Sequence, residues 1–214
     1  TAKRGGGAFV NTLRGLILMQ DNTFSDNAAS MSTGGGAIVA SSSGEGNISL
    51  IRNTINGNSA PNNTGGGMYL ITSNGEIFLE NNVCFDNQGK SGGGFLISNS
   101  NVLNMHNNTI VGNTATGAYA SGGGVMLLGG TTEGVFHLVN NLFYDNYCQA
   151  GSIRNDIHKS ARPMYLLHNG YYGEILGSDE FITSEGNFDT TLAPGFVNGD
   201  PEPNEEYDLD LAPG

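Results

Sequence analysis

The stretches Gly34-Gly-Gly-Ala-Ile-Val-Ala40 and Asn22-Thr-Phe-Ser-Asp-Asn27 decide the fold, because both recur in a fixed order. Each Gly triplet is followed by apolar residues, and triplets begin at Gly5, Gly34, Gly65, Gly92 and Gly122. Between them the second stretch recurs as NTINGN, NVCFDN, NTIVGN and NLFYDN, with a degenerate sixth copy, HNGYYG, around Asn169. The triplet spacings of 29, 31, 27 and 30 residues define a cycle of about 29. Such a period is typical of a repeat architecture.

Apolar residues alternate with variable ones ahead of each first Asn. The positions five and three residues before it are apolar in every copy, as in Ile17 and Met19, and the residue between them varies. A period of two is typical of a strand with one buried face. Each cycle therefore predicts a Gly-led strand, a second strand, an Asn turn and a short third strand.

Three strands and three turns per cycle predict an all-β fold, a right-handed parallel β-helix, or solenoid. A single coil cannot bury its inner face alone, so the coils must stack, with a rise of about 4.8 Å each. We expect about five to six coils of about 29 residues over residues 1–172. Residues 173–214 are expected to form an irregular acidic segment that caps or covers the stack, since open ends expose strand edges.

Stacking would place equivalent residues above one another, so the first Asn of each copy predicts a ladder. Each side-chain amide can donate to the side-chain carbonyl of the next, which satisfies polar groups inside a turn. The residue before the second Asn of each copy alternates between Asp and Gly, which tolerate turns with positive φ. The predicted ladder comprises Asn22, Asn53, Asn82, Asn108 and Asn141.

The motifs GGAI at Gly35–Ile38 and FSDN at Phe24–Asn27 resemble the paired GGA[ILV] and FxxN repeats of chlamydial-type polymorphic outer membrane proteins. FYDN at Phe143–Asn146 is a second match, whereas GGMY, GGFL, GGVM, INGN, CFDN and IVGN depart from the pattern. The resemblance covers about residues 5–148 and extends to other bacterial secreted β-helix proteins. It implies a secreted or outer-membrane surface passenger, often adhesive. The ending EYDLDLAPG looks like a segment that closes many such domains, which implies flanking domains in a longer parent protein.

Charge is distributed unevenly along the chain. Of the formal −12, residues 1–162 contribute −1 and residues 163–214 contribute −11, because all eight Lys and Arg lie at or before Arg162. A chain without a basic stripe is a poor nucleic-acid binder, and no apolar run approaches the roughly 18 residues of a membrane span. Without an initiator Met or an apolar leader, we expect a mature chain or an excised fragment.

The acidic end carries the candidate calcium ligands, because Ca²⁺ prefers carboxylate oxygens. No EF-hand or nonapeptide calcium pattern is present, and a solvated acidic loop is the simpler interpretation. We therefore expect no cofactor, with calcium as the alternative. The candidate ligands are Asp200, Glu202, Glu205, Glu206, Asp208 and Asp210.

Carbohydrate-active enzymes are the main functional alternative. Polysaccharide lyases and glycoside hydrolases include β-helix proteins, and hydrolases use paired carboxylates. The candidates here are Asp26, Asp86 and Asp145, one on every second coil and therefore roughly 10 Å apart. The turn preference of Asp favours a structural role for this column.

The Gly-led strand carries no charge at its first four positions in any copy. Because side chains alternate between faces, one apolar column must point outward, either the residues after each triplet or their neighbours. A strand that is apolar on both faces is normally covered on both. We therefore predict an apolar outer face at Ala37, Met68, Phe95 and Val125, covered by the C-terminal segment, a partner or another copy.

His106 and His137 fall on outward positions of adjacent second strands, where a metal pair is conceivable but lacks a third ligand column. Cys84 occupies an inward apolar column and reads as a small buried residue. Cys148 lies two coils later, beyond the roughly 7 Å Cα limit for a disulfide, so two free thiols are expected.

These features favour a non-catalytic extracellular or cell-surface module, a passenger or stalk used in adhesion or surface display. Its expected partners are glycans or the surface proteins of host or neighbouring cells. A carbohydrate-active enzyme, or a glycan-binding fragment of one, is the alternative, and it rests on architecture alone.

Overall fold

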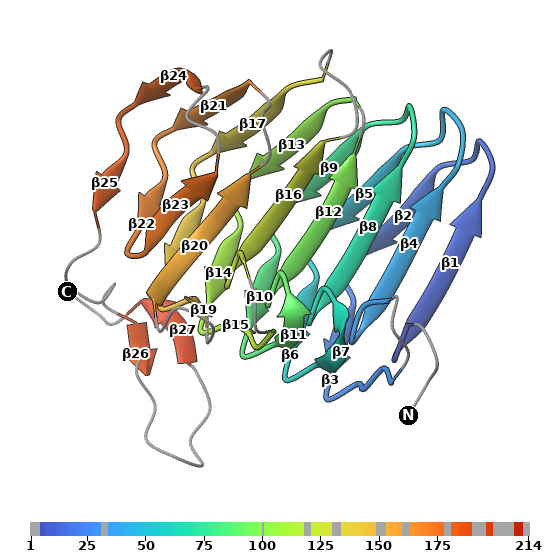
Figure 1. Cartoon of the computed structure of the whole chain (residues 1–214), viewed down its shortest axis with the longest axis horizontal. Helices are drawn as coiled ribbons and strands as arrows, with labels where there is room; N and C mark the ends of the chain where they lie inside the picture. The colour runs from blue at the N-terminus through green and yellow to red at the C-terminus, as the bar shows by residue number, and fades with distance from the viewer. Residues whose placement is uncertain are drawn as a thin grey trace.

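The computed structural model describes residues 5–30, 34–99, 101–117, 121–129, 134–148, 153–159, 163–177, 181–189, 196–198 and 208–211. Within these ranges the chain forms strands, and no helix is long and apolar enough to span a membrane. The strands stack in sequence order along one axis (Figure 1). The predicted all-β solenoid is confirmed, and each coil contributes one strand to each of three parallel sheets.

The first sheet contains the Gly-led strands in sequence order, and their pairing is parallel and mostly in register. These strands are β1 (Ala8–Thr12), β4 (Ile38–Ser42), β8 (Met68–Thr72), β12 (Phe95–Asn99), β16 (Val125–Gly129), β20 (Ile153–Lys159) and β23 (Glu174–Gly177). β20 also pairs antiparallel with β19, which joins this sheet to a row of short parallel strands. That row comprises β19 (Tyr147–Cys148), β15 (Thr114–Ala115), β11 (Gln88–Ser91) and β7 (Ser59–Thr64).

The second and third sheets each contain seven parallel strands. The second comprises β2 (Ile17–Gln20), β5 (Ile48–Ile51), β9 (Ile77–Glu80), β13 (Leu103–His106), β17 (Phe136–Val139), β21 (Met164–Leu167) and β24 (Phe181–Glu185). The third comprises β3 (Thr23–Ser25), β6 (Thr54–Asn56), β10 (Val83–Phe85), β14 (Thr109–Val111), β18 (Leu142–Tyr144), β22 (Gly170–Tyr171) and β25 (Phe188–Asp189).

Two corners of the coils use a left-handed residue followed by an Asn. The corner between the second and third sheets has φ of 51–56° at Asp21, Arg52, Asn81, Asn107, Asn140 and His168. The corner after the third sheet has φ of 51–62° at Asp26, Gly57, Asp86, Gly112 and Asp145. Asp, Asn and Gly accept this conformation at the lowest cost, so the predicted turn role of the alternating Asp and Gly is confirmed.

The Gly-triplet corner is crowded by backbone. Gly92 has φ of +64°, and a Cβ there would lie 2.5 Å from the carbonyl oxygen of Phe95. A Cβ on Gly66 would lie 2.1 Å from the carbonyl oxygen of Gly93 on the next coil. The third position is less tight, because the nearest atom to an added Cβ would lie 3.1 Å away at Gly7, 2.8 Å away at Gly67 and 2.7 Å away at Gly94. Steric exclusion therefore explains the first two glycines of a triplet more strictly than the third.

The core lies inside the coils and is lined by the inward-facing apolar residues of the three sheets. It includes the residues expected on the outer face, because Ala37, Met68 and Val125 are 0% exposed and Phe95 is 1% exposed. The prediction that these four residues form an outer face is wrong, and it also aligned Ala37, in place of Ile38, with Met68. The Ala37 amide donates to the carbonyl of Gly67, so Ala37 takes the place of a third glycine and Ile38 pairs with Met68.

The stack extends beyond the expected boundary at residue 172. β23, β24 and β25 pair in parallel with β20, β21 and β22 and form a seventh coil that ends at Asp189. The five full repeats are thus followed by two shorter coils. Further along, β26 (Phe196–Asn198) and β27 (Asp208–Leu211) form an antiparallel pair, so the segment 173–214 is not wholly irregular.

Candidate functional site

The Asn ladder at the first corner is confirmed and is longer than predicted. The backbone amide and Nδ2 of Asn53 both donate to Oδ1 of Asn82, each at 3.0 Å. The same pair of bonds links every step of the ladder, in the order Asn22, Asn53, Asn82, Asn108, Asn141, Asn169 and Asn187. From Asn53 to Asn169 these residues are at most 2% exposed. The ladder is therefore part of the buried structure of the coil.

A second Asn ladder runs along the other corner, and the sequence analysis did not predict it as a ladder. It passes through Asn27, Asn58, Asn87, Asn113 and Asn146 with the same paired bonds. The recurrence of the second Asn in NTFSDN-type copies was the available signal. Two parallel ladders fix the register of neighbouring coils at both corners.

The second ladder ends on a carboxylate, Asp156, which is 0% exposed. Nδ2 of Asn146 donates to Oδ1 of Asp156 at 2.8 Å. The backbone amides of Tyr172 and Gly173 donate to Oδ2 at 2.9 and 2.6 Å. Burial raises the pKa of Asp156, and these hydrogen bonds oppose that shift. Asp156 therefore uses both oxygens to end the ladder.

The candidate catalytic carboxylates lie along one corner of the stack and are used there as turn residues. Asp86 is flanked along the column by Gly57 and Gly112, and burial together with the charge of Asp26 raises the pKa of Asp86. Asp145 forms an ion pair with Arg154 at 3.1 Å. The Arg154 guanidinium also lies 4.3 Å from the ring centre of Tyr172. These contacts support a structural role for the column.

The outward column of the first sheet is the neighbour of the predicted one. It contains Val39, Tyr69, Leu96, Met126 and His158, which pair in register on adjacent strands. Leu96 is only 2% exposed and Val39 only 5%, although both point away from the core. Burial lowers the pKa of His158, whose Nδ1 is buried without a hydrogen bond in the described part of the chain. The outward apolar column thus lies one residue away from its expected position, and Val39 and Leu96 in it are buried.

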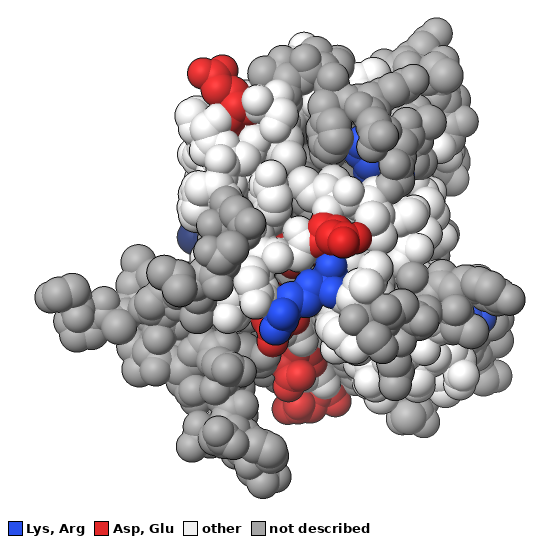
Figure 2. All heavy atoms as spheres, turned by 60° about the vertical axis from the view of Figure 1, so that its left-hand side comes forward, with Lys and Arg blue, Asp and Glu red and all other residues white. Residues whose placement is uncertain are grey.

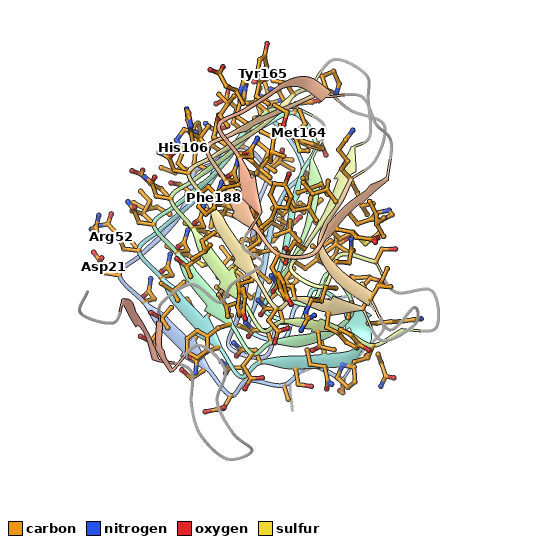
Figure 3. The ribbon with its side chains drawn as sticks, turned by 90° about the vertical axis from the view of Figure 1, so that its left-hand side faces the viewer. Asp21, Arg52, His106, Met164, Tyr165 and Phe188 are labelled. Carbon is orange, nitrogen blue, oxygen red and sulfur yellow. The ribbon has the colours of Figure 1, made fainter. Side chains whose placement is uncertain are left out.

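The outward face of the second sheet carries a stack of rings. His137 and Tyr165 stack with centroids 4.9 Å apart and an interplanar angle of 6°. Tyr165 projects from the outer side of this sheet, whereas the neighbouring Met164 points inward (Figure 3). Burial and the nearby His106 lower the pKa of His137. The rings of His137 and Tyr165 therefore cover each other, and their stacking links the fifth coil to the sixth.

The described ranges contain no metal-binding cluster, and most of the candidate calcium ligands lie outside them. No group of three or more His, Cys, Asp or Glu residues there is placed to hold a metal ion. Cys84 and Cys148 are both buried free thiols, as expected. The candidates Asp200, Glu202, Glu205 and Glu206 lie outside the described residues, and for Asp208 and Asp210 only the strand β27 is described.

Charged side chains are sparse on the described part of the face in Figure 2, where acidic and basic groups lie beside one another on a largely uncharged surface. A cavity of about 400 Å³ lies between the last two coils. Its lining includes the apolar side chains of Leu166, Ile175 and Leu176, together with Glu174. The titratable groups of the described lining are the carboxylate of Glu174 and the phenol of Tyr171, so this lining contains no pair of carboxylates.

No curated protein and no solved structure matches the chain. Residues 4–162 match the model of a family described as "Periplasmic copper-binding protein (NosD)". The matched range covers coils one to five and ends just after β20 of the sixth. Because this match extends over well more than half of the sequence, the chain belongs to the NosD family.

Proposed function

We propose that this chain is a non-catalytic binding scaffold that acts outside the cytoplasm, in the periplasm or on the cell surface. The observation that carries the proposal is the match of residues 4–162 to a family described as periplasmic. The β-helix of seven coils tied by two Asn ladders supports it, since such a stack is a rigid, extended support for an outer surface.

Within that class, we propose a role in adhesion or surface display. On the outward column of the first sheet, Val39 and Leu96 are buried, and the partly exposed side chains of Tyr69 and Met126 offer an uncharged contact surface for a glycan or a protein of another cell. The repeat motifs that resemble those of surface passengers support the same role.

The family description names copper, so the question is whether the described residues could hold that metal. Copper sites in proteins are built from His, Cys thiolate and Met. Burial raises the pKa of the Cys148 thiol to about 11 and also raises that of Cys84, so neither is a thiolate at neutral pH. His106 and His137 supply two imidazoles, without a third His, Cys, Asp or Glu ligand among the described residues. These residues do not fit a copper centre, and no copper chemistry is derived for the chain.

The catalytic alternative is tested by turnover. The purified chain is incubated with pectin, alginate and related glycans, and released reducing ends and unsaturated products are measured. We expect no products from the wild type. Products that disappear in Asp86→Asn and Asp145→Asn, but persist in the matched corner variant Asp21→Asn, would overturn the scaffold proposal.

The binding role is tested separately on a glycan array and in a cell-adhesion assay. We expect binding that weakens at least about tenfold in Tyr69→Ser with Met126→Ser, because these substitutions remove apolar contact area from the outer face. The control is Phe78→Ser on the second sheet, which is expected to bind as the wild type does. Equal binding by all three proteins, or none by any, contradicts this role for the face.

A further inference from the structure

We infer that the first coil is a docking surface for another coil of the same repeat, supplied by chain that precedes it in a longer polypeptide. Oδ1 of Asn22 and Oδ1 of Asn27 accept no hydrogen bond from the described residues. At every later step of the two ladders, down to Asn187 and Asp156, this oxygen accepts bonds from the coil before it. The first coil thus presents two acceptors at the positions where a preceding coil would present two donors.

The first coil is built as an interior coil but lies at an end. Asn22 is exposed, whereas Asn53 on the next coil is 1% exposed. Of the five large hydrophobic side chains exposed in the described ranges, four lie on this coil: Leu13 (67%), Leu16 (63%), Leu18 (52%) and Phe9 (47%). Its inward residues Val10 and Phe24 are only partly buried against the core. Capping coils of solenoids normally present a polar outer face, so this coil lacks the properties of a cap.

The direction of the hydrogen bonds along the two Asn ladders determines which partner can dock on the first coil. Each Asn donates through its backbone amide and Nδ2 and accepts through Oδ1, so the stack has an acceptor end at the first coil. Two copies that meet through their first coils would place acceptors opposite acceptors, which forms no bonds. The interface already present between all neighbouring coils is parallel and continuous with this surface.

A second copy docked head to tail fits only half of the surface. Its seventh coil would offer the backbone amide of Asn187 to Asn22, whereas the Nδ2 of Asn187 already donates to the carbonyl of Leu166 and to Oγ of Ser184. The described residues of its seventh coil, which end at Asp189, offer no donor for Asn27, and the second ladder ends earlier, at Asp156, whose oxygens accept bonds from Asn146, Tyr172 and Gly173. A coil with an Asn at both corners satisfies both acceptors, and coils two to five of this chain are of that kind.

The test supplies such a coil from the chain itself. A copy of residues 35–64 is inserted between Arg4 and Gly5, which keeps the register because Gly35 and Gly65 occupy equivalent positions. The inserted copies of Asn53 and Asn58 then face Asn22 and Asn27. We expect the Tm to rise by roughly 5 °C or more, and amides of β2 and β3 to exchange at least about tenfold more slowly.

The matched control carries Asp at both inserted Asn positions, which keeps size and oxygen acceptors but removes the Nδ2 donors. It should gain less than half of the rise in Tm. No rise with the intact insert, or an equal rise with the control, overturns the inference. The wild-type chain should be monomeric by light scattering over a hundredfold range of concentration. A concentration-dependent dimer would assign the surface to a second copy and also overturns the inference.

A further variant does not depend on the folding of the insert. Leu16→Ser with Leu18→Ser should leave the Tm of the chain within about 2 °C, because exposed side chains away from special contacts contribute little to stability. It should also lower the binding of a hydrophobic dye by at least about a third, because two exposed apolar groups are removed. A fall in Tm above about 5 °C would show that these residues serve this chain's own fold, and the inference would fail.

Discussion

Each buried Asn of a ladder satisfies several polar groups at once, and Asn108 shows how many. Its Oδ1 accepts two bonds from Asn82, and its Nδ2 donates to the carbonyls of Leu79 and His106 and to Oδ1 of Asn141. Asn108→Ala leaves these groups buried without partners, at about 1–3 kcal/mol each. We expect a loss of at least about 3 kcal/mol in urea unfolding. Asn22→Ala, at the exposed end of the same ladder, should lose less than about 1 kcal/mol.

Asp156 should make stability depend on pH. Its pKa is raised in the folded state by burial, so the folded state holds the proton more tightly than the unfolded state. The linked stability is fully present below the ordinary pKa of Asp and is lost as pH rises through the raised value. Asp156→Asn cannot titrate, so the curve of unfolding free energy against pH should lose this component. An unchanged curve in the variant contradicts the prediction, and the exposed corner variant Asp26→Asn is the control.

At the scale of the element, the Gly-triplet corner tolerates a side chain at one position and not at another. Gly66→Ala places a Cβ 2.1 Å from the carbonyl oxygen of Gly93 and 2.5 Å from the carbonyl carbon of Gln88, so backbone must move. We expect a loss of at least about 3 kcal/mol, or failure to fold. Gly7→Ala meets nothing closer than 3.1 Å and reproduces Ala37 of the next coil. Its unfolding free energy should stay within about 1 kcal/mol of wild type, and similar losses in both variants would contradict the argument.

The inward faces of the second and third strands of each coil could be predicted from the sequence, but that of the Gly-led strand could not. The inward columns of the second and third strands follow from their apolar alternation, and residues such as Ile48, Leu50 and Ile55 are 0% exposed. The Gly-led strand is apolar at successive positions, as in Met68-Tyr-Leu-Ile71, so alternation cannot say which column faces the core. A one-residue slip reverses the faces. The column of Met68, Phe95 and Val125 was therefore assigned to the wrong face, and Ala37 added a separate misalignment by one residue, because its small side chain fits the third glycine position.

At the scale of the whole molecule, the sequence shows the solenoid but not where it ends. The sixth and seventh coils lack Gly triplets, and the seventh is held by backbone pairing, by Asn187 and by the packing of Ile175 against the core. Backbone pairing is indifferent to side chains, so it leaves no periodic signal in the sequence. The candidate site was predicted less well than the fold. Burial of the outer column and termination of a ladder by Asp156 depend on contacts between distant residues.

A stack whose coils contact only their neighbours should be most stable in the middle. Coils two to five carry both Asn ladders and lie between paired neighbours, whereas the first coil is exposed on one side and the seventh carries only Asn187. We expect native-state hydrogen exchange to be slowest in β9, β13 and β17 of the second sheet. Amides of β2 and β24 should exchange at least about a hundredfold faster, through local opening of the end coils. Equal protection of all seven strands would mean that the molecule opens only globally, and the nearest-neighbour account of its stability would then be wrong.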